Sequence, residues 1–110
     1  MFLHSVLFWL RDDLTDGEVA WFEKGLDRLT SISSVRFNFI GKPASTRRAV
    51  IDHSYSYQLV VGFDSLAGHD AYQEDKVHLA FIRDFASSWT RVQVYDADAI
   101  SSIAACGSRE

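Results

Sequence analysis

The chain has 110 residues, of which 47% are apolar and 14% aromatic, so it can bury the core of one domain. Acids and bases are scattered along the chain and sum to a formal charge of −4, which leaves no basic patch for nucleic acid or an anionic membrane surface. No apolar run approaches the roughly 18 residues of a membrane span. The single cysteine, Cys106, excludes an intrachain disulfide and a thiolate metal cluster, and we expect a cytoplasmic protein.

The opening segment, MFLHSVLFWL, lacks the basic start and the cleavage site of a signal peptide, so we interpret it as a buried strand. Its apolar residues occupy both alternating faces, and His4 shares one face with Val6, Phe8 and Leu10. Thr15 and Glu18 then have the spacing of a capping box, which predicts the start of a helix. An apolar stripe continues this helix to about residue 31, at Val19, Phe22, Leu26 and Leu29.

Alternating patterns predict three further strands. Residues 35–39 form a half-exposed or edge strand that ends at Gly41-Lys42-Pro43, and residues 42–54 show no period and are expected to form a long loop. Residues 57–63 are apolar on both faces and predict a central strand. Residues 89–96 predict the last strand, with Val92 and Val94 on one face and Trp89, Gln93 and Tyr95 on the other.

Two helical segments lie between the third and fourth strands. The first is expected from a cap at Asp64-Ser65 to about Glu74, and the second carries Val77, Phe81 and Phe85 at intervals of four residues. We expect the segments to meet near Asp75-Lys76.

The resulting order, β-α-β-β-α-β, is that of an α+β, ferredoxin-like fold with a four-stranded antiparallel sheet whose first and third strands are central. Two helical layers cover one face of such a sheet, so the apolar residues on the other face predict a homodimer packed sheet against sheet. We expect a domain over residues 1–97 and a flexible tail over residues 98–110.

The four histidines, His4, His53, His69 and His78, do not have the spacing of a local metal motif, so no metal site is predicted. The sequence also lacks a glycine-rich phosphate loop and a Gly-x-Ser-x-Gly elbow, and no cofactor is predicted. His4 is either a base at the mouth of an apolar cavity or a strand-end histidine bonded to backbone. Tyr72 is either a site residue or a core tyrosine with its hydroxyl at the rim, and His78 faces either the sheet or solvent.

Five stretches of the sequence resemble one known family. They are HSVLFWL, DGEVAWFEKGLDRL, YSYQLVVGF, AYQEDKVHLAF and WTRVQVYDA, and together they are similar to the stress-responsive A/B barrel domain (Dabb) family of dimeric α/β barrels. The resemblance implies a dimeric barrel, and most members of the family have no assigned activity. One plant member is a polyketide cyclase that performs a cofactor-free aldol condensation, and its reactive residues match His4, Tyr72 and His78. Many members carry His-Pro where this chain has Asp75-Lys76.

The resemblance therefore implies three possible functions. The first is a small dimeric protein that binds an apolar or aromatic ligand in a pocket within each barrel half. The second is a cofactor-free cyclase or lyase in which His78 is the general base, His4 assists and Tyr72 orients a carbonyl group. The third is a dimeric-barrel monooxygenase, because related barrels include monooxygenases and some of them bind haem.

Overall fold

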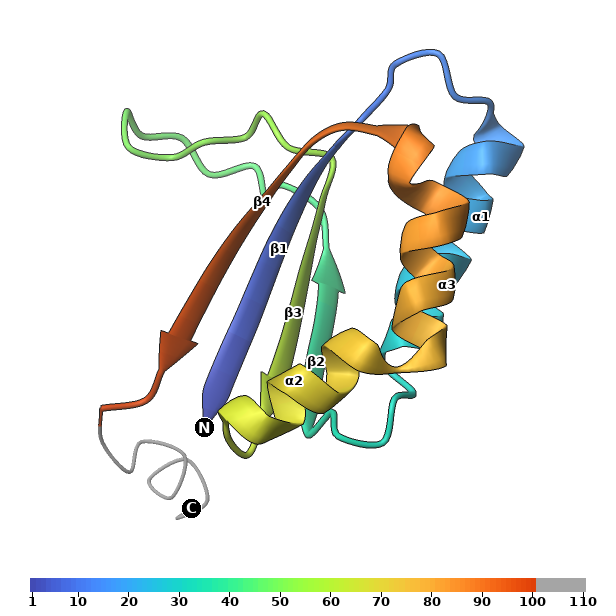
Figure 1. Cartoon of the computed structure of the whole chain (residues 1–110). Helices are drawn as coiled ribbons and strands as arrows, with labels where there is room; N and C mark the ends of the chain where they lie inside the picture. The colour runs from blue at the N-terminus through green and yellow to red at the C-terminus, as the bar shows by residue number, and fades with distance from the viewer. Residues whose placement is uncertain (101–110) are drawn as a thin grey trace.

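A computed structural model describes residues 1–100 and contains a four-stranded antiparallel sheet in the order β2-β3-β1-β4. Figure 1 shows α1 and α3 side by side over one face of this sheet, while α2 runs across the end of the sheet near the N-terminus. The strands and helices are β1 (Phe2–Leu10), α1 (Asp16–Leu29), β2 (Phe37–Gly41), β3 (Tyr57–Phe63), α2 (Leu66–Glu74), α3 (Lys76–Phe85) and β4 (Trp89–Asp98), with a short 3₁₀ turn at Ala86–Ser88 before β4.

This arrangement confirms the predicted ferredoxin-like α+β fold and the central position of the first and third strands. In the register, His4 of β1 lies between Val61 of β3 and Asp96 of β4. Side chains on this face of the sheet lie under the helices, and we call it the helix face. The opposite face, which we call the open face, has no covering element among residues 1–100 and carries exposed apolar side chains at Leu3, Phe37, Phe39 and Tyr95.

Helix α1 begins where the capping pattern predicts. The Thr15 hydroxyl accepts a hydrogen bond from the Glu18 amide at 3.1 Å, and the Glu18 carboxylate accepts one from the Thr15 amide at 2.8 Å. These reciprocal bonds satisfy two backbone donors that have no partner within the helix. The predicted stripe then packs inward, with Phe22, Leu26 and Leu29 buried.

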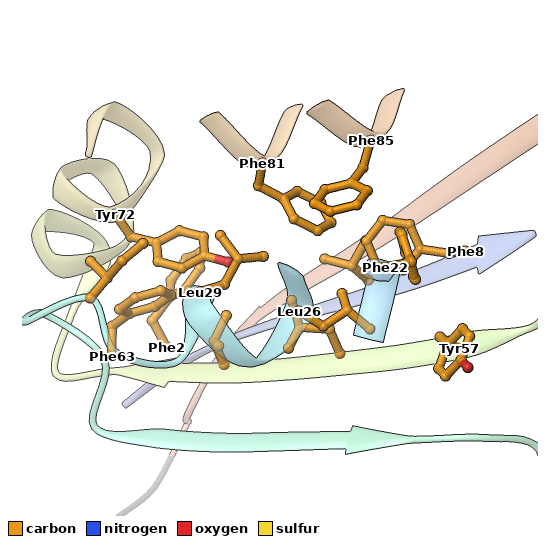
Figure 2. Close-up of a cluster of buried hydrophobic side chains, with 14 residues drawn as sticks. Phe2, Phe8, Phe22, Leu26, Leu29, Tyr57, Phe63, Tyr72, Phe81 and Phe85 are labelled. Carbon is orange, nitrogen blue, oxygen red and sulfur yellow. The ribbon is translucent and has the colours of Figure 1, made fainter. Parts of the chain in front are cut away.

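The core between the helices and the sheet is rich in aromatic side chains (Figure 2). The Phe8 and Phe22 rings meet edge to face with centroids 5.3 Å apart, and Phe81 lies within 6.0 Å of both. Edge-to-face pairs of this kind add about 0.5–1.5 kcal/mol beyond the burial of their area. The contact between Phe81 of α3 and Phe8 of β1 holds the helix against the strand.

The break between α2 and α3 falls at Asp75, as predicted. Asp75 has extended backbone angles, and its carboxylate accepts a hydrogen bond from the Val77 amide at 2.8 Å, which caps the start of α3. Because the chain turns here, Tyr72 of α2 and His78 of α3 both lie near His4 of β1.

One face prediction is wrong. The alternation predicted that Trp89 shares a face with Gln93 and Tyr95, but Trp89 packs against Phe8 and Phe81 on the helix face, with ring centroids 5.1 and 6.0 Å away. The pairing register of β4 with β1 shifts between Trp9 and Leu10, so β4 holds one additional residue there. A bulge of this kind inverts the face of every residue beyond it.

The ends of two elements differ from the predicted ones. Val35 precedes β2 instead of lying within it, and β4 continues to Asp98, after which the Ala99 amide donates a hydrogen bond to the Met1 carbonyl. Residues 42–56 contain no regular element, as expected for the loop. The rest of the predicted tail, residues 101–110 with Cys106, lies outside the described residues. No helix among residues 1–100 has the length and apolar character to span a membrane.

Candidate functional site

His4 lies on the helix face of the central strand β1, and only 5% of it is exposed. Its Nδ1 atom is 2.6 Å from Asp96 Oδ1 on the neighbouring strand β4. A carboxylate can only accept, so Nδ1 is the donor and the lone pair of the neutral ring lies on Nε2. Burial lowers the pKa of His4, and the hydrogen bond to Asp96 opposes that shift. The arrangement therefore orients a neutral imidazole with one nitrogen available as a base.

Tyr72 of α2 is buried, and its ring is 6.0 Å from that of His4. In Figure 2 its hydroxyl oxygen is directed away from α2 and into the cluster. Burial raises the pKa of Tyr72, so the group is a neutral hydroxyl at physiological pH. Tyr72 lines the same cavity as His4 and His78, where a neutral hydroxyl can donate a hydrogen bond to a bound molecule.

His78 lies in the first turn of α3 with its ring centroid 5.0 Å from that of Tyr72. Its Nδ1 atom is buried and makes no hydrogen bond within the described part of the chain. Burial lowers the pKa of His78, with a smaller contribution from the charge of His4. Buried polar atoms in native proteins are nearly always paired, so an unpaired one beside a cavity indicates a missing partner such as water or a ligand.

His4, Tyr72 and His78 all line one cavity of about 180 Å³. Most of its remaining wall is apolar and comes from the sheet and the two long helices, at Val6, Phe8, Leu29, Leu59, Phe81, Ile82, Trp89, Val92 and Val94. Ile82, Val92 and Val94 are each about two-fifths exposed, at 41%, 40% and 41%, so the cavity opens between α3 and β4. The three predicted residues thus meet at the polar end of an apolar cavity.

Three polar neighbours of this site were not predicted from the sequence. Gln73 also lines the cavity, Asp96 binds His4, and the ring centroid of His69 lies 5.0 Å from that of His4. Asp96 and His4 are adjacent only through the pairing of β1 with β4, so no local spacing signals them. Placing the predicted last strand antiparallel to the first would have brought Asp96 close to His4.

A second, larger hollow of about 300 Å³ lies between α1 and α3. Its wall contains Trp21, Arg28 and Asp84. Arg28 stacks on the Trp21 ring at 4.6 Å, and the described residues that line the hollow include no histidine or tyrosine. It has fewer groups for acid–base chemistry than the smaller cavity, so we place the candidate site at the smaller one.

The fold and the site together define a ferredoxin-like α+β protein with a half-buried apolar cavity at the sheet. The family model of the Stress responsive A/B Barrel Domain (Dabb) matches residues 2–99, and the chain belongs to this family. No curated protein matches the chain.

Several solved structures share the fold. The protein At3g17210 from Arabidopsis thaliana is 22% identical, with a TM-score of 0.78 over 92% of this chain and 97% of that one. A dimeric ferredoxin-like protein of unknown function from Thermobifida fusca is 20% identical, with a TM-score of 0.72 over 89% and 90%. A hydroxynitrile lyase from Passiflora edulis is 15% identical, with a TM-score of 0.74 over 91% and 94%. At these identities the similarity establishes the fold.

Proposed function

We propose that the protein binds a small apolar or aromatic molecule, with one polar group, in the cavity at His4, Tyr72 and His78. The observation that carries the proposal is the buried His78 Nδ1, which has no hydrogen-bond partner within residues 1–100 and lies with Tyr72 at one end of an apolar cavity. A neutral hydroxyl can donate, and a neutral imidazole can donate or accept. Together they suit a carbonyl or phenolic oxygen on a ligand whose remaining surface is apolar.

The size of the cavity limits the ligand. A cavity of roughly 150 Å³ lined by apolar side chains can hold a benzene molecule, and this one measures about 180 Å³. One aromatic ring with a short substituent therefore fits inside, and a longer chain would extend through the opening between Ile82 and Val92. Substituted acetophenones, which carry one ring and one carbonyl group, are suitable probes.

Thermal unfolding and titration calorimetry test this binding. Acetophenones are expected to raise the melting temperature more than ethylbenzene, which has the ring without the carbonyl group, because the polar groups of the cavity then gain a partner. Val94→Trp should abolish the effect by filling the opening, whereas Val50→Trp in the exposed loop should leave it unchanged. If no aromatic compound binds, or if both variants respond alike, the proposal is wrong.

A second candidate function is cofactor-free proton abstraction next to a carbonyl group, as in a lyase or an aldol-type cyclase. The orientation of His4 by Asp96 at 2.6 Å favours it, because a carboxylate partner fixes the tautomer and stabilises the imidazolium that forms. The resemblance assigned the base to His78, but within residues 1–100 no carboxylate forms a hydrogen bond or ion pair with His78. We therefore assign proton removal to His4 and carbonyl binding to Tyr72 and His78. The hydroxynitrile lyase among the structural neighbours indicates that this fold is compatible with lyase chemistry.

Exchange of the α-hydrogens of a bound ketone in deuterated water tests the second candidate without knowledge of the natural substrate. The reaction moves only a proton: His4 Nε2 takes it from the α-carbon, an enolate forms, and a deuteron returns. His4→Gln should reduce the exchange rate to the background, and His53→Gln should not change it. Exchange that is equally fast in His4→Gln would rule out the role of His4. The monooxygenase stays a prediction that no observed feature favours.

We also propose that the chain forms a homodimer through the open face of the sheet. Phe37, Phe39 and Tyr95 on that face are 47%, 49% and 63% exposed, and a sheet face that exposes several large apolar side chains is suited to an interface. The neighbour from Thermobifida fusca is described as dimeric and has the same fold. Packing of two such faces would bury these side chains and leave both cavities open on the opposite side of each sheet.

A further inference from the structure

His69 is a histidine that neither proposed function uses, yet it lies beside His4. It projects from α2, and its ring lies 4.8 Å from that of Phe2 and meets the His4 ring edge on at 5.0 Å. Its side chain is only 14% exposed. Two imidazoles and the Asp96 carboxylate thus gather where β1, α2 and β4 meet.

We propose that His4, His69 and Asp96 form a binding site for a divalent transition metal of the Zn²⁺ class. One candidate ligand atom from each residue lies within 4.8 Å of the other two. The residues come from three separate elements, which is why local spacing along the sequence predicted no metal site. The proposal goes beyond the binding of an organic ligand.

The donor set has the chemistry of a metal that keeps an open coordination position. Imidazole nitrogen favours zinc, copper, nickel and iron over magnesium and calcium, and two histidines with one carboxylate are a recurring set in which another position remains for water or substrate. Since His4 also lines the cavity, that open position would lie near its polar end.

The surroundings of His69 supply the support that metal-binding histidines usually have. His69 Nδ1 is 3.1 Å from Asp70 Oδ1, so this nitrogen donates to a carboxylate and Nε2 carries the lone pair. The Gln73 side-chain nitrogen lies 3.4 Å from Nε2, a long contact that a stronger ligand can replace. His69 is therefore held in the tautomer that binds a metal through Nε2.

The distances require a small adjustment. Zinc bonds of about 2.0–2.1 Å in a tetrahedral site place the ligand atoms about 3.4 Å apart. The His4 and Asp96 atoms already lie 2.6 Å apart around a shared proton, so a metal would replace that proton and separate them slightly. All the ligand atoms lie within 4.8 Å of one another, so any wider pair would close by no more than about 1.4 Å. The Asp96 side chain is 39% exposed and has room to move.

Metal binding and proton abstraction would then compete for the same imidazole. A metal bound by His4 and Asp96 would take from His4 the carboxylate that orients it as a base. Zn²⁺ should therefore slow α-hydrogen exchange if His4 is the base. Failure of ligand binding or of exchange would leave the metal proposal standing, because metal affinity is measured without either.

Calorimetry with Zn²⁺ and visible spectroscopy with Co²⁺ test the site on the full chain, in a Cys106→Ser background that removes the thiol. We expect one ion per chain and d–d bands typical of four or five ligands. His69→Phe, which retains the ring packing on Phe2, and Asp96→Asn should each weaken affinity about tenfold or more. His53→Phe is the matched control and should bind as the parent does.

Two measurements distinguish a loss of metal binding from misfolding of a variant. Circular dichroism of the metal-free variants checks their structure, and ring-nitrogen NMR of the parent protein should show Zn²⁺ shifting His4 and His69 but not His53. No binding at millimolar Zn²⁺, equal affinity in His69→Phe, or ring shifts at His53 alone would each overturn the proposal.

Discussion

The close contact of α1 and α3 at Gly25 gives a quantitative test of the packing. A β-carbon at this position would lie 2.4 Å from Phe85 Cε2 and 2.8 Å from Cζ, against an ordinary carbon separation of about 3.5–4.0 Å. The Phe85 ring would have to move by roughly 1 Å or more. It is buried, with its centroid 5.6 Å from the Phe22 ring and 5.1 Å from the Phe81 ring, so a movement would disturb its packing against both rings (Figure 2).

The expected effect of Gly25→Ala is the difference between two terms. Overpacking a core costs about 1–3 kcal/mol. We take the upper value because the Phe85 ring packs against two other aromatic rings. Alanine regains about 1 kcal/mol of helix propensity, so the free energy of unfolding should fall by about 2 kcal/mol. For a domain of this size the melting temperature should then fall by about 8 °C or more.

Gly17→Ala is the matched control, because it makes the same substitution in the first turn of the same helix. A β-carbon there meets only Thr15 Oγ1 at 3.9 Å, so the gain in helix propensity is not opposed, and stability should rise by up to about 1 kcal/mol. Both variants are compared with the parent by thermal and urea unfolding at one protein concentration. A Gly25→Ala variant that melts at or above the parent temperature would refute the reasoning.

Two further predictions concern pH and assembly. Burial lowers the pKa of His4 and His78 in the folded state, so the unfolded chain binds protons more readily and stability should be fully present above about pH 6.5 and decrease as the pH falls below it. Urea midpoints across this range should show a smaller decrease in His78→Phe, and an equal decrease would contradict the role of His78. Phe39→Lys on the open face should weaken the dimer, whereas Leu79→Lys, an exposed change on α3, should not; light scattering at several concentrations distinguishes the two. A parent protein that is monomeric at micromolar concentration would end the dimer proposal.

Local patterns in the sequence predicted most of the fold because each depends on a few neighbouring residues. The capping box at Thr15 and Glu18 sets the start of α1, and the break at Asp75 follows from the two helical periods on either side. The central position of β1 followed from apolar residues on both faces. These features need no knowledge of distant contacts.

The candidate site was predicted only in part. His4, Tyr72 and His78 came from the family resemblance, and each alone had an equally good interpretation as a structural residue. Their position around one cavity depends on how β1, α2 and α3 pack, which residue type cannot specify. The face of Trp89 was mispredicted because a single additional residue in β4 is visible only in the pairing register.

The sequence by itself therefore determined the elements, their order and the family, because periodicity and capping act over a few residues. Only the tertiary structure decided which polar groups share a space. Asp96 reaches His4 through the pairing of the first and last strands, and His69 approaches the same ring because α2 crosses the end of the sheet. A chemical site depends on distances of a few ångströms between groups far apart in the chain, and the packing of the layers fixes those distances.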